Sequence, residues 1–171
     1  AEACRAHGHT ALELWAEHGR EAFYTRCGFT PVLAFETLLA FARGEPGSAL
    51  PEATTWDPPV AMIELHGWLR EAWERTPFDQ RASFRSDELA LAHLAREGRS
   101  FAIHRTLLAP DVADAVPDVL ACFDRLLQRL PAPAPVLAIA LDRVSSITAA
   151  LREHGWSVAQ RGTVMSLRLT P

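Results

Sequence analysis

The side chains that could perform chemistry near the start of this chain do not form a complete catalytic or metal-binding motif. Cys4, His7 and His9 make a Cys-x-x-His-x-His cluster, which has the residue types of a zinc site. No second ligand pair follows at the spacing of a structural zinc site, so surface histidines at a helix end are the competing interpretation. The chain also lacks a nucleophile elbow, a P-loop and a dinucleotide-binding glycine fingerprint. We therefore expect no metal ion.

One further histidine, His104, lies inside the apolar segment Phe101–Leu108. Such a residue is either a base or, more typically, a sheet residue whose hydrogen bonds are satisfied by its neighbours. Trp68 and Trp73 lie on adjoining faces of a segment that suits a helix, which is more typical of core or interface packing than of a ligand site.

Composition limits the classes of function. The chain has 171 residues, 49% of them hydrophobic, which suits one domain or two small ones. A net charge of −4 argues against a nucleic-acid partner, and no apolar run reaches the roughly 18 residues of a membrane span. The three cysteines have no paired spacing, which favours a reduced, cytoplasmic protein. All basic residues are arginine and asparagine is absent, a bias typical of GC-rich bacterial genomes.

An internal repeat organises these residues. Residues 10–39 and 136–169 each read as a strand, a short helix that ends at a glycine–aromatic pair, and an extended segment. Superposing Gly28 on Gly155 pairs Phe29 with Trp156. The segment 10–15 alternates with a strand period, although its length also fits a short helix. Residues 1–9 resemble the end of a helix with Gly8 as its cap.

The remaining elements predict an α/β arrangement of helices and strands in layers. We expect a proline- and glycine-rich linker at 43–59, and the region after it to run from 60 to 171. In that region the patterns predict helices at 66–75 and from 86 to 98, and a strand at 100–108. They also predict a long helix that begins at Asp111 or Val116 and ends at Pro131, and a strand from Val136.

The motif Ala22-Phe23-Tyr24, followed by Gly28-Phe29 and Pro31-Val32, resembles the closing signature of the GNAT superfamily of acyl-coenzyme A N-acyltransferases. The resemblance implies a mixed, twisted sheet flanked by helices, with residues 1–42 as the C-terminal portion of a first domain. Residues 60–171 resemble a second, degenerate GNAT-like domain, so the chain is similar to the C-terminal part of a tandem member.

The resemblance implies acetyl transfer from acetyl-coenzyme A to a primary amine on a small molecule or peptide. In the family the cofactor enters a splay between the fourth and fifth strands, and a glycine-rich loop binds its pyrophosphate. The first copy starts too late to contain that loop, and the second has Leu107-Leu-Ala-Pro-Asp111 in its place. We therefore expect the chain to be N-terminally truncated and, in isolation, to bind the cofactor weakly and lack activity.

By the same resemblance Tyr24 is the catalytic acid, which protonates the coenzyme sulfur as it leaves; the alternative is a packing role. Its counterpart in the second copy is Leu151, which has no proton to donate. The cofactor-binding residues implied are Ala16, Glu17, His18 and Phe23. Glu17 or His18 could instead cap the helix, act as a base, or form a solvated helix start.

A second function stays open from the sequence. The two half-domains could pack together as a non-catalytic interaction or structural module. In either case an incomplete first sheet leaves the edge of the 10–15 strand unpaired, which predicts that it pairs with the second half-domain or forms a homodimer.

Overall fold

The structure is a computed structural model that describes residues 10–47, 63–64, 81–86, 90–108 and 116–169. The described residues form a mixed sheet with three helices. In chain order the elements are β1 (Ala11–Glu17), α2 (Glu21–Arg26), β2 (Thr30–Phe41), β3 (Ile63–Glu64), β4 (Arg81–Ser86), β5 (Ala90–Glu97), β6 (Ser100–Leu108), α5 (Val116–Arg129), β7 (Pro135–Asp142), α6 (Ser146–Glu153) and β8 (Ser157–Arg168). The predicted α/β class with a mixed, helix-flanked sheet is confirmed.

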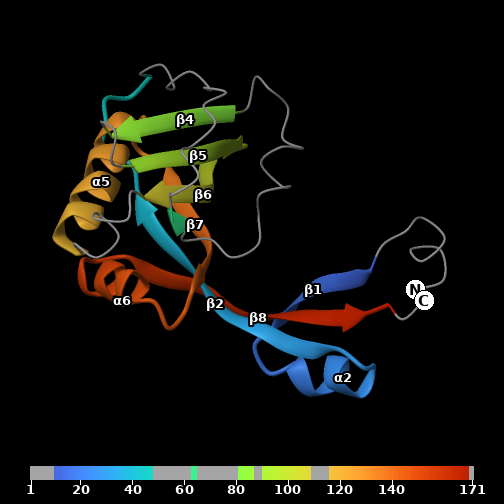
Figure 1. The fold of residues 1–171 in the computed structure, drawn as a ribbon. Coiled ribbons are helices and arrows are strands. Elements are labelled where there is room, and N and C mark those ends of the chain that lie inside the picture. Colours follow the sequence, from blue (N-terminus) through green and yellow to red (C-terminus); the bar gives the residue numbers. More distant parts are fainter. Residues whose placement is uncertain (1–9, 48–62, 65–80, 87–89, 109–115, 170–171) are drawn as a thin grey trace.

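The sheet has eight strands in the order β1-β8-β2-β7-β6-β5-β4, with β3 paired to β6. Only β6 and β7 pair in parallel among these strands; the other pairs are antiparallel. The long strands β2 and β8 run from the end that carries α2 to the end that carries α5 and α6 (Figure 1). Strands from residues 1–42 and from residues 60–171 thus lie side by side in one sheet.

The predicted repeat is visible as two β–α–β units, β1-α2-β2 and β7-α6-β8. Both helices end in the same way: the backbone N–H of Phe29 donates to Tyr24, and that of Trp156 donates to Leu151, each at 3.0 Å. Gly28 and Gly155 have φ values of 90° and 97°, a conformation that favours glycine and reverses the chain after each helix. The strand prediction for 10–15 is confirmed.

The strands of the two copies alternate in the sheet. In the order β1-β8-β2-β7, each strand of one copy lies beside a strand of the other, and the central pair β2–β8 is antiparallel. Phe35 pairs directly with Gly162, which is its own counterpart in the repeat. The two copies are therefore related by an approximate twofold axis near this pair.

The predicted helix from 86 to 98 is wrong, because residues 90–97 form β5. β5 pairs on both sides, with β4 and with β6, and the consecutive residues Leu94 and Ala95 are both buried. A strand that is buried on both faces does not alternate between apolar and polar residues. The spacing of its apolar residues therefore also fits a helix. Gly98, at φ 62°, is not a helix cap but the first residue of the tight turn that joins Glu97 to Ser100.

Six further elements agree with the predicted ones, whereas β3 and β4 were not predicted from the sequence. β2, β6, α5, β7, α6 and β8 lie at the expected positions, and the long helix is described from Val116. The predicted helix end at 1–9, the helix at 66–75 and most of the linker lie outside the described residues.

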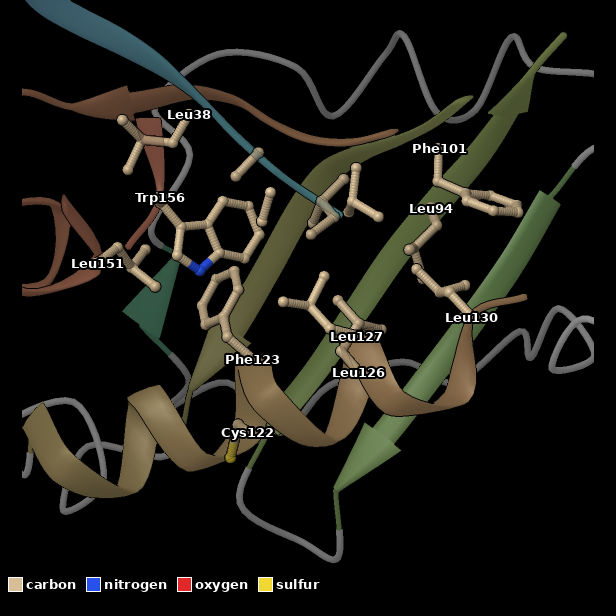
Figure 2. Packing of buried hydrophobic residues seen from close by; sticks show 14 of the residues in the cluster. Leu38, Leu94, Phe101, Cys122, Phe123, Leu126, Leu127, Leu130, Leu151 and Trp156 are labelled. Atoms are coloured by element: carbon tan, nitrogen blue, oxygen red, sulfur yellow. The ribbon is translucent and has the colours of Figure 1, made fainter. Parts of the chain in front are cut away.

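The main core lies between the sheet and the helices α5 and α6. Phe123, Leu126 and Leu127 extend from α5 toward the strands, and the helix α6 adds Leu151 (Figure 2). Trp156 meets Phe123 edge-on, with ring centroids 5.5 Å apart. This packing fixes α6 against the sheet, and with it the loop that joins β7 to α6.

Candidate functional site

Tyr24 lies on α2 and is half-buried. Its ring makes edge-to-face contacts with Phe29, at 6.1 Å between centroids, and with Phe23, at 5.2 Å. Such contacts fix the ring without using its hydroxyl, so the phenol keeps its capacity to donate a proton. Its counterpart Leu151 is fully buried in the main core, which is a packing role. The catalytic assignment of Tyr24 stays a prediction.

Glu17 is the last residue of β1, and His18 follows it in the exposed turn that leads into α2. Glu17 forms an ion pair with Arg20 at 3.3 Å, and His18, whose side chain is 74% exposed, lies 3.9 Å from Glu21. Neither residue caps the helix, because the N-cap is Arg20 and no side chain makes the capping hydrogen bond. Both residues are solvated and precede the helix, and their role as cofactor ligands stays a prediction.

Ala16 and Phe23, the other two predicted cofactor ligands, have opposite environments. Ala16 is fully buried in β1, and its carbonyl oxygen lies directly against Gly162. Phe23 is 57% exposed on α2 and contacts Tyr24. The structure therefore brings Phe23 and Tyr24 together on one short helix, while Ala16 lies inside the sheet.

Glu21 holds the start of α2 in place, although the sequence analysis did not identify it as a candidate residue. Its carboxylate accepts hydrogen bonds from the Gly19 N–H at 2.8 Å and from the Thr163 hydroxyl at 3.1 Å. Its own backbone N–H is the largest cause that lowers the pKa of Glu21, and the Thr163, Gly19 and His18 contacts lower it further. Glu21 therefore joins the start of α2 to β8. An acidic residue in the first turn of a predicted helix was the available signal.

The second feature is a separation of two parallel strands. β6 and β7 pair only from Phe101 to Ile103, and no pair between these strands follows in the described residues. At the same point along β6, its pairing with β5 shifts by one residue, so His104 has no partner residue in β5. In β7, Ala140 has a φ of 52°, a rare conformation for a residue with a side chain. Pairing between the two strands therefore stops before their carboxyl ends, and the splay implied by the resemblance stays a prediction.

His104 is buried at this separation. Its exposed fraction is 8%, and its Nε2 lies 3.3 Å from Oε1 of Glu97. Burial lowers the pKa of His104, and the charge of Glu97 and its hydrogen bond oppose that shift. A buried histidine with a depressed pKa is neutral at physiological pH, which is the form that accepts a proton. His104 is thus a candidate base that the sequence alone left as a sheet residue.

A further charged site was also missed by sequence reasoning. Glu36 is fully buried in β2 and contacts three arginines. A lone carboxylate inside the apolar run 30–41 was the signal that could have found it.

Within the described ranges, no three potential ligand side chains gather at one point. The Cys4, His7 and His9 cluster lies outside those ranges. In the same part of the chain, no helix has the length and apolarity to cross a membrane.

Among known proteins, several solved structures are similar to this chain. No protein-family description and no curated protein matches the sequence. The chain is similar to a putative acetyltransferase from Pyrococcus horikoshii, with 12% identity, a TM-score of 0.45, and coverage of 94% of this chain and 54% of that one. It is similar to a GCN5-related N-acetyltransferase from Sphaerobacter thermophilus, with 10% identity, a TM-score of 0.48, and coverage of 94% and 60%.

A GCN5-related N-acetyltransferase from Anabaena variabilis gives 9% identity, a TM-score of 0.47, and coverage of 96% and 47%. The chain thus spans about half the length of the solved structures that it matches. At these identities the likeness does not assign the chain to a family.

Proposed function

We propose that this chain is part of an acyl-coenzyme A-dependent N-acyltransferase that transfers an acetyl group to a primary amine of a small molecule or peptide. The observation that carries the proposal is the separation of β6 from β7 after three paired residues. A gap between parallel strands, open toward their carboxyl ends, is a common place for a ligand in α/β sheets. The motif around Tyr24 supports the same reaction class.

We place an amide-containing cofactor arm, such as that of coenzyme A, at the point where β6 and β7 stop pairing. Further along the same strand Leu107 and Leu108 pair with β3, so this point is confined to the residues just after Ile103. The phosphate end fits less well, because the first turn of α5 carries the acidic Asp118.

Tyr24 would supply the proton that the leaving thiolate takes up, while the attacking amine loses one. Acetyl-coenzyme A, when bound, supplies an activated acetyl thioester and a thiolate leaving group. The phenol of Tyr24 carries an O–H, so its Oη can donate a proton to a developing anion. Phe23 and Phe29 hold the ring in place. Ala16, Glu17, His18 and Phe23 are the residues proposed to lie along the cofactor.

The approximate twofold relation suggests a missing neighbour for β1. In the second copy, β7 has the parallel strand β6 on its outer side; at the equivalent side of β1 no strand is described. We therefore propose that a further polypeptide segment pairs with β1, and that residues 1–42 complete a first domain with that segment. The division into 1–42, a 43–59 linker and 60–171 belongs to this proposal. Without that segment the chain would be inactive.

We place the protein in the cytoplasm, because Cys27 and Cys122 are both free thiols and a reduced compartment keeps them so.

The alternative is a non-catalytic interaction or structural module. One support is Leu151, the counterpart of Tyr24 in the second copy, which is buried in the core and cannot act as an acid. The other is that Glu17 and His18 form ion pairs at the surface. Under this alternative the splay is a packing irregularity.

Release of free thiol from acetyl-coenzyme A distinguishes the two functions. The intact protein is incubated with acetyl-coenzyme A and a panel of primary amines and amine-bearing peptides. Amine-dependent thiol release with a matching acetylated product supports the transferase. Its absence across the panel, together with no detectable coenzyme binding by the intact protein, supports the interaction module.

A further inference from the structure

Three arginines converge on one buried carboxylate. Nε of Arg161 lies 2.9 Å from Oε1 of Glu36, Nη1 of Arg152 lies 3.2 Å from Oε2, and Nε of Arg143 lies 3.7 Å from Oε1. The carboxylate is on β2, and the arginines come from β8, from α6 and from the loop after β7. We refer to Glu36, Arg143, Arg152 and Arg161 as the arginine cluster.

The cluster carries more positive charge than the carboxylate can neutralise. Three guanidinium groups against one carboxylate leave two positive charges in excess. Glu36 is 0% exposed, whereas the arginine side chains are 48%, 36% and 46% exposed. In the described part of the chain, these arginines form no ion pair with any other acidic residue. The excess charge therefore faces solvent.

The geometry also leaves hydrogen-bond donors available. Three guanidinium groups carry about fifteen N–H donors, and one carboxylate offers about four acceptor positions. Arg143 and Arg161 approach Glu36 through Nε, so their terminal Nη groups do not make the contacts to the carboxylate. Fork-shaped guanidinium groups bind phosphate oxygens in pairs, which makes a phosphate the best complement to this arrangement.

The fold does not require the cluster. With Gly28 superposed on Gly155, the equivalents of Glu36, Arg143, Arg152 and Arg161 in the other copy are uncharged: Thr163, Ala16, Thr25 and Ala34. The same β–α–β unit therefore folds without these charges. Burying a carboxylate and gathering like charges both cost free energy, so a purely structural role would be met by one arginine or by apolar residues.

The place of the cluster in the sheet agrees with ligand binding. Arg143 follows the carboxyl end of β7, the strand that separates from β6. Ligands of α/β sheets commonly bind beyond the carboxyl ends of the strands. Packing of α6 on the main core holds Arg152 beside the same strand end.

We infer that Arg143, Arg152 and Arg161 form a binding site for a phosphate group, with Glu36 as the positioning residue that holds the three guanidinium groups together. The phosphate belongs either to a free phosphate ion or to the phosphate-bearing end of a cofactor. The inference goes beyond the transferase proposal and does not depend on it, because phosphate binding requires no acetyl transfer.

Calorimetric titration of the chain with inorganic pyrophosphate at neutral pH and low salt tests the inference. We expect a dissociation constant below about 1 mM, weakened by added salt because exposed charges are screened. The variant with both Arg143→Gln and Arg152→Gln keeps the shortest pair, Arg161 with Glu36, and should bind at least about tenfold more weakly.

The matched control carries Arg26→Gln and Arg129→Gln, which remove the same charge from exposed positions in the last turns of α2 and α5. It should bind pyrophosphate as the wild type does. If the double variant of the cluster does not fold, the single change Arg143→Gln replaces it, since this arginine makes the longest contact. Glu36→Gln should weaken binding although it adds positive charge, because it releases the arginines from their common partner.

A parallel titration with coenzyme A identifies the source of the phosphate. Tighter binding of coenzyme A than of pyrophosphate, lost in the cluster variant, assigns the site to a cofactor phosphate. Pyrophosphate binding without an advantage for coenzyme A assigns it to a free phosphate ion. No pyrophosphate binding by the wild type, or an equal loss in the control variant, would overturn the inference.

Discussion

Replacement of Gly162 by alanine tests the close approach of the two copies at the centre of the sheet. A Cβ at this position would lie 2.6 Å from the carbonyl oxygen of Ala16, 2.6 Å from Cζ of Phe35 and 2.9 Å from Cε1 of the same ring. Ordinary contacts of a Cβ begin near 3.4 Å. The Phe35 ring is fully buried and lies tilted at 45° against Trp15, with ring centroids 4.8 Å apart, so its neighbours restrict its movement.

The expected cost follows from these contacts. Overpacking a buried site costs about 1–3 kcal/mol, and we expect the upper half of that range because one of the two obstacles is backbone. For a chain of this size each kcal/mol lowers the melting temperature by roughly 2–4 °C, so Gly162→Ala should lower it by about 4–12 °C.

Thermal unfolding monitored by circular dichroism measures this effect. The exposed Gln160→Ala on the same strand is the control and should leave the melting temperature within about 1 °C. In a Phe35→Leu background the ring atoms are absent, so Gly162→Ala should cost less there than in the wild type. A melting temperature unchanged by Gly162→Ala, or an equal cost in both backgrounds, would refute the described pairing of Phe35 with Gly162.

Three further predictions concern the second copy, the separated strands and the cofactor. Leu151→Ala should cost about 2–5 kcal/mol of folding free energy in urea unfolding, because the side chain is fully buried, and should leave turnover per folded molecule nearly unchanged. Burial lowers the pKa of His104 from 6.5, so the unfolded chain binds the proton first and stability should fall as the pH drops below about 6.5. His104→Leu should flatten that pH dependence in urea unfolding; an unchanged slope would contradict the burial argument. If a further segment completes the first domain, as proposed, the 171-residue chain alone should bind acetyl-coenzyme A at least about a hundredfold more weakly in calorimetry than the chain with that segment, since two lost charge-assisted hydrogen bonds suffice for that difference; micromolar affinity of the chain alone would contradict this.

Local signals in the sequence predicted the β–α–β units because their cause is local. Gly28 and Gly155 end their helices through a backbone conformation that depends on a few neighbouring residues. The same kind of signal failed at Gly98, where one glycine served equally well as a helix cap or as a hairpin turn. Pairing of β5 with strands on both sides decided between them, and that pairing is not visible in the segment itself.

The features that depend on distant contacts could not be predicted from the residues alone. Glu36 and Arg161 are 125 positions apart, and only the pairing of β2 with β8 makes them neighbours. The short parallel pairing of β6 and β7, which creates the separation at His104, is likewise a property of the assembled sheet. Tyr24 was predicted from its motif, and its half-buried position leaves the catalytic role to be tested by experiment.

The most direct test of the proposed transferase is the turnover of Tyr24→Phe in the intact protein. The substitution keeps the ring and its contacts with Phe23 and Phe29, so stability should hardly change, which unfolding experiments can verify. If the phenol is the general acid, amine-dependent thiol release from acetyl-coenzyme A should fall by about 10²–10⁴-fold. Full turnover of Tyr24→Phe at every pH, or no acetyl transfer by the wild type with any amine, would contradict the proposal.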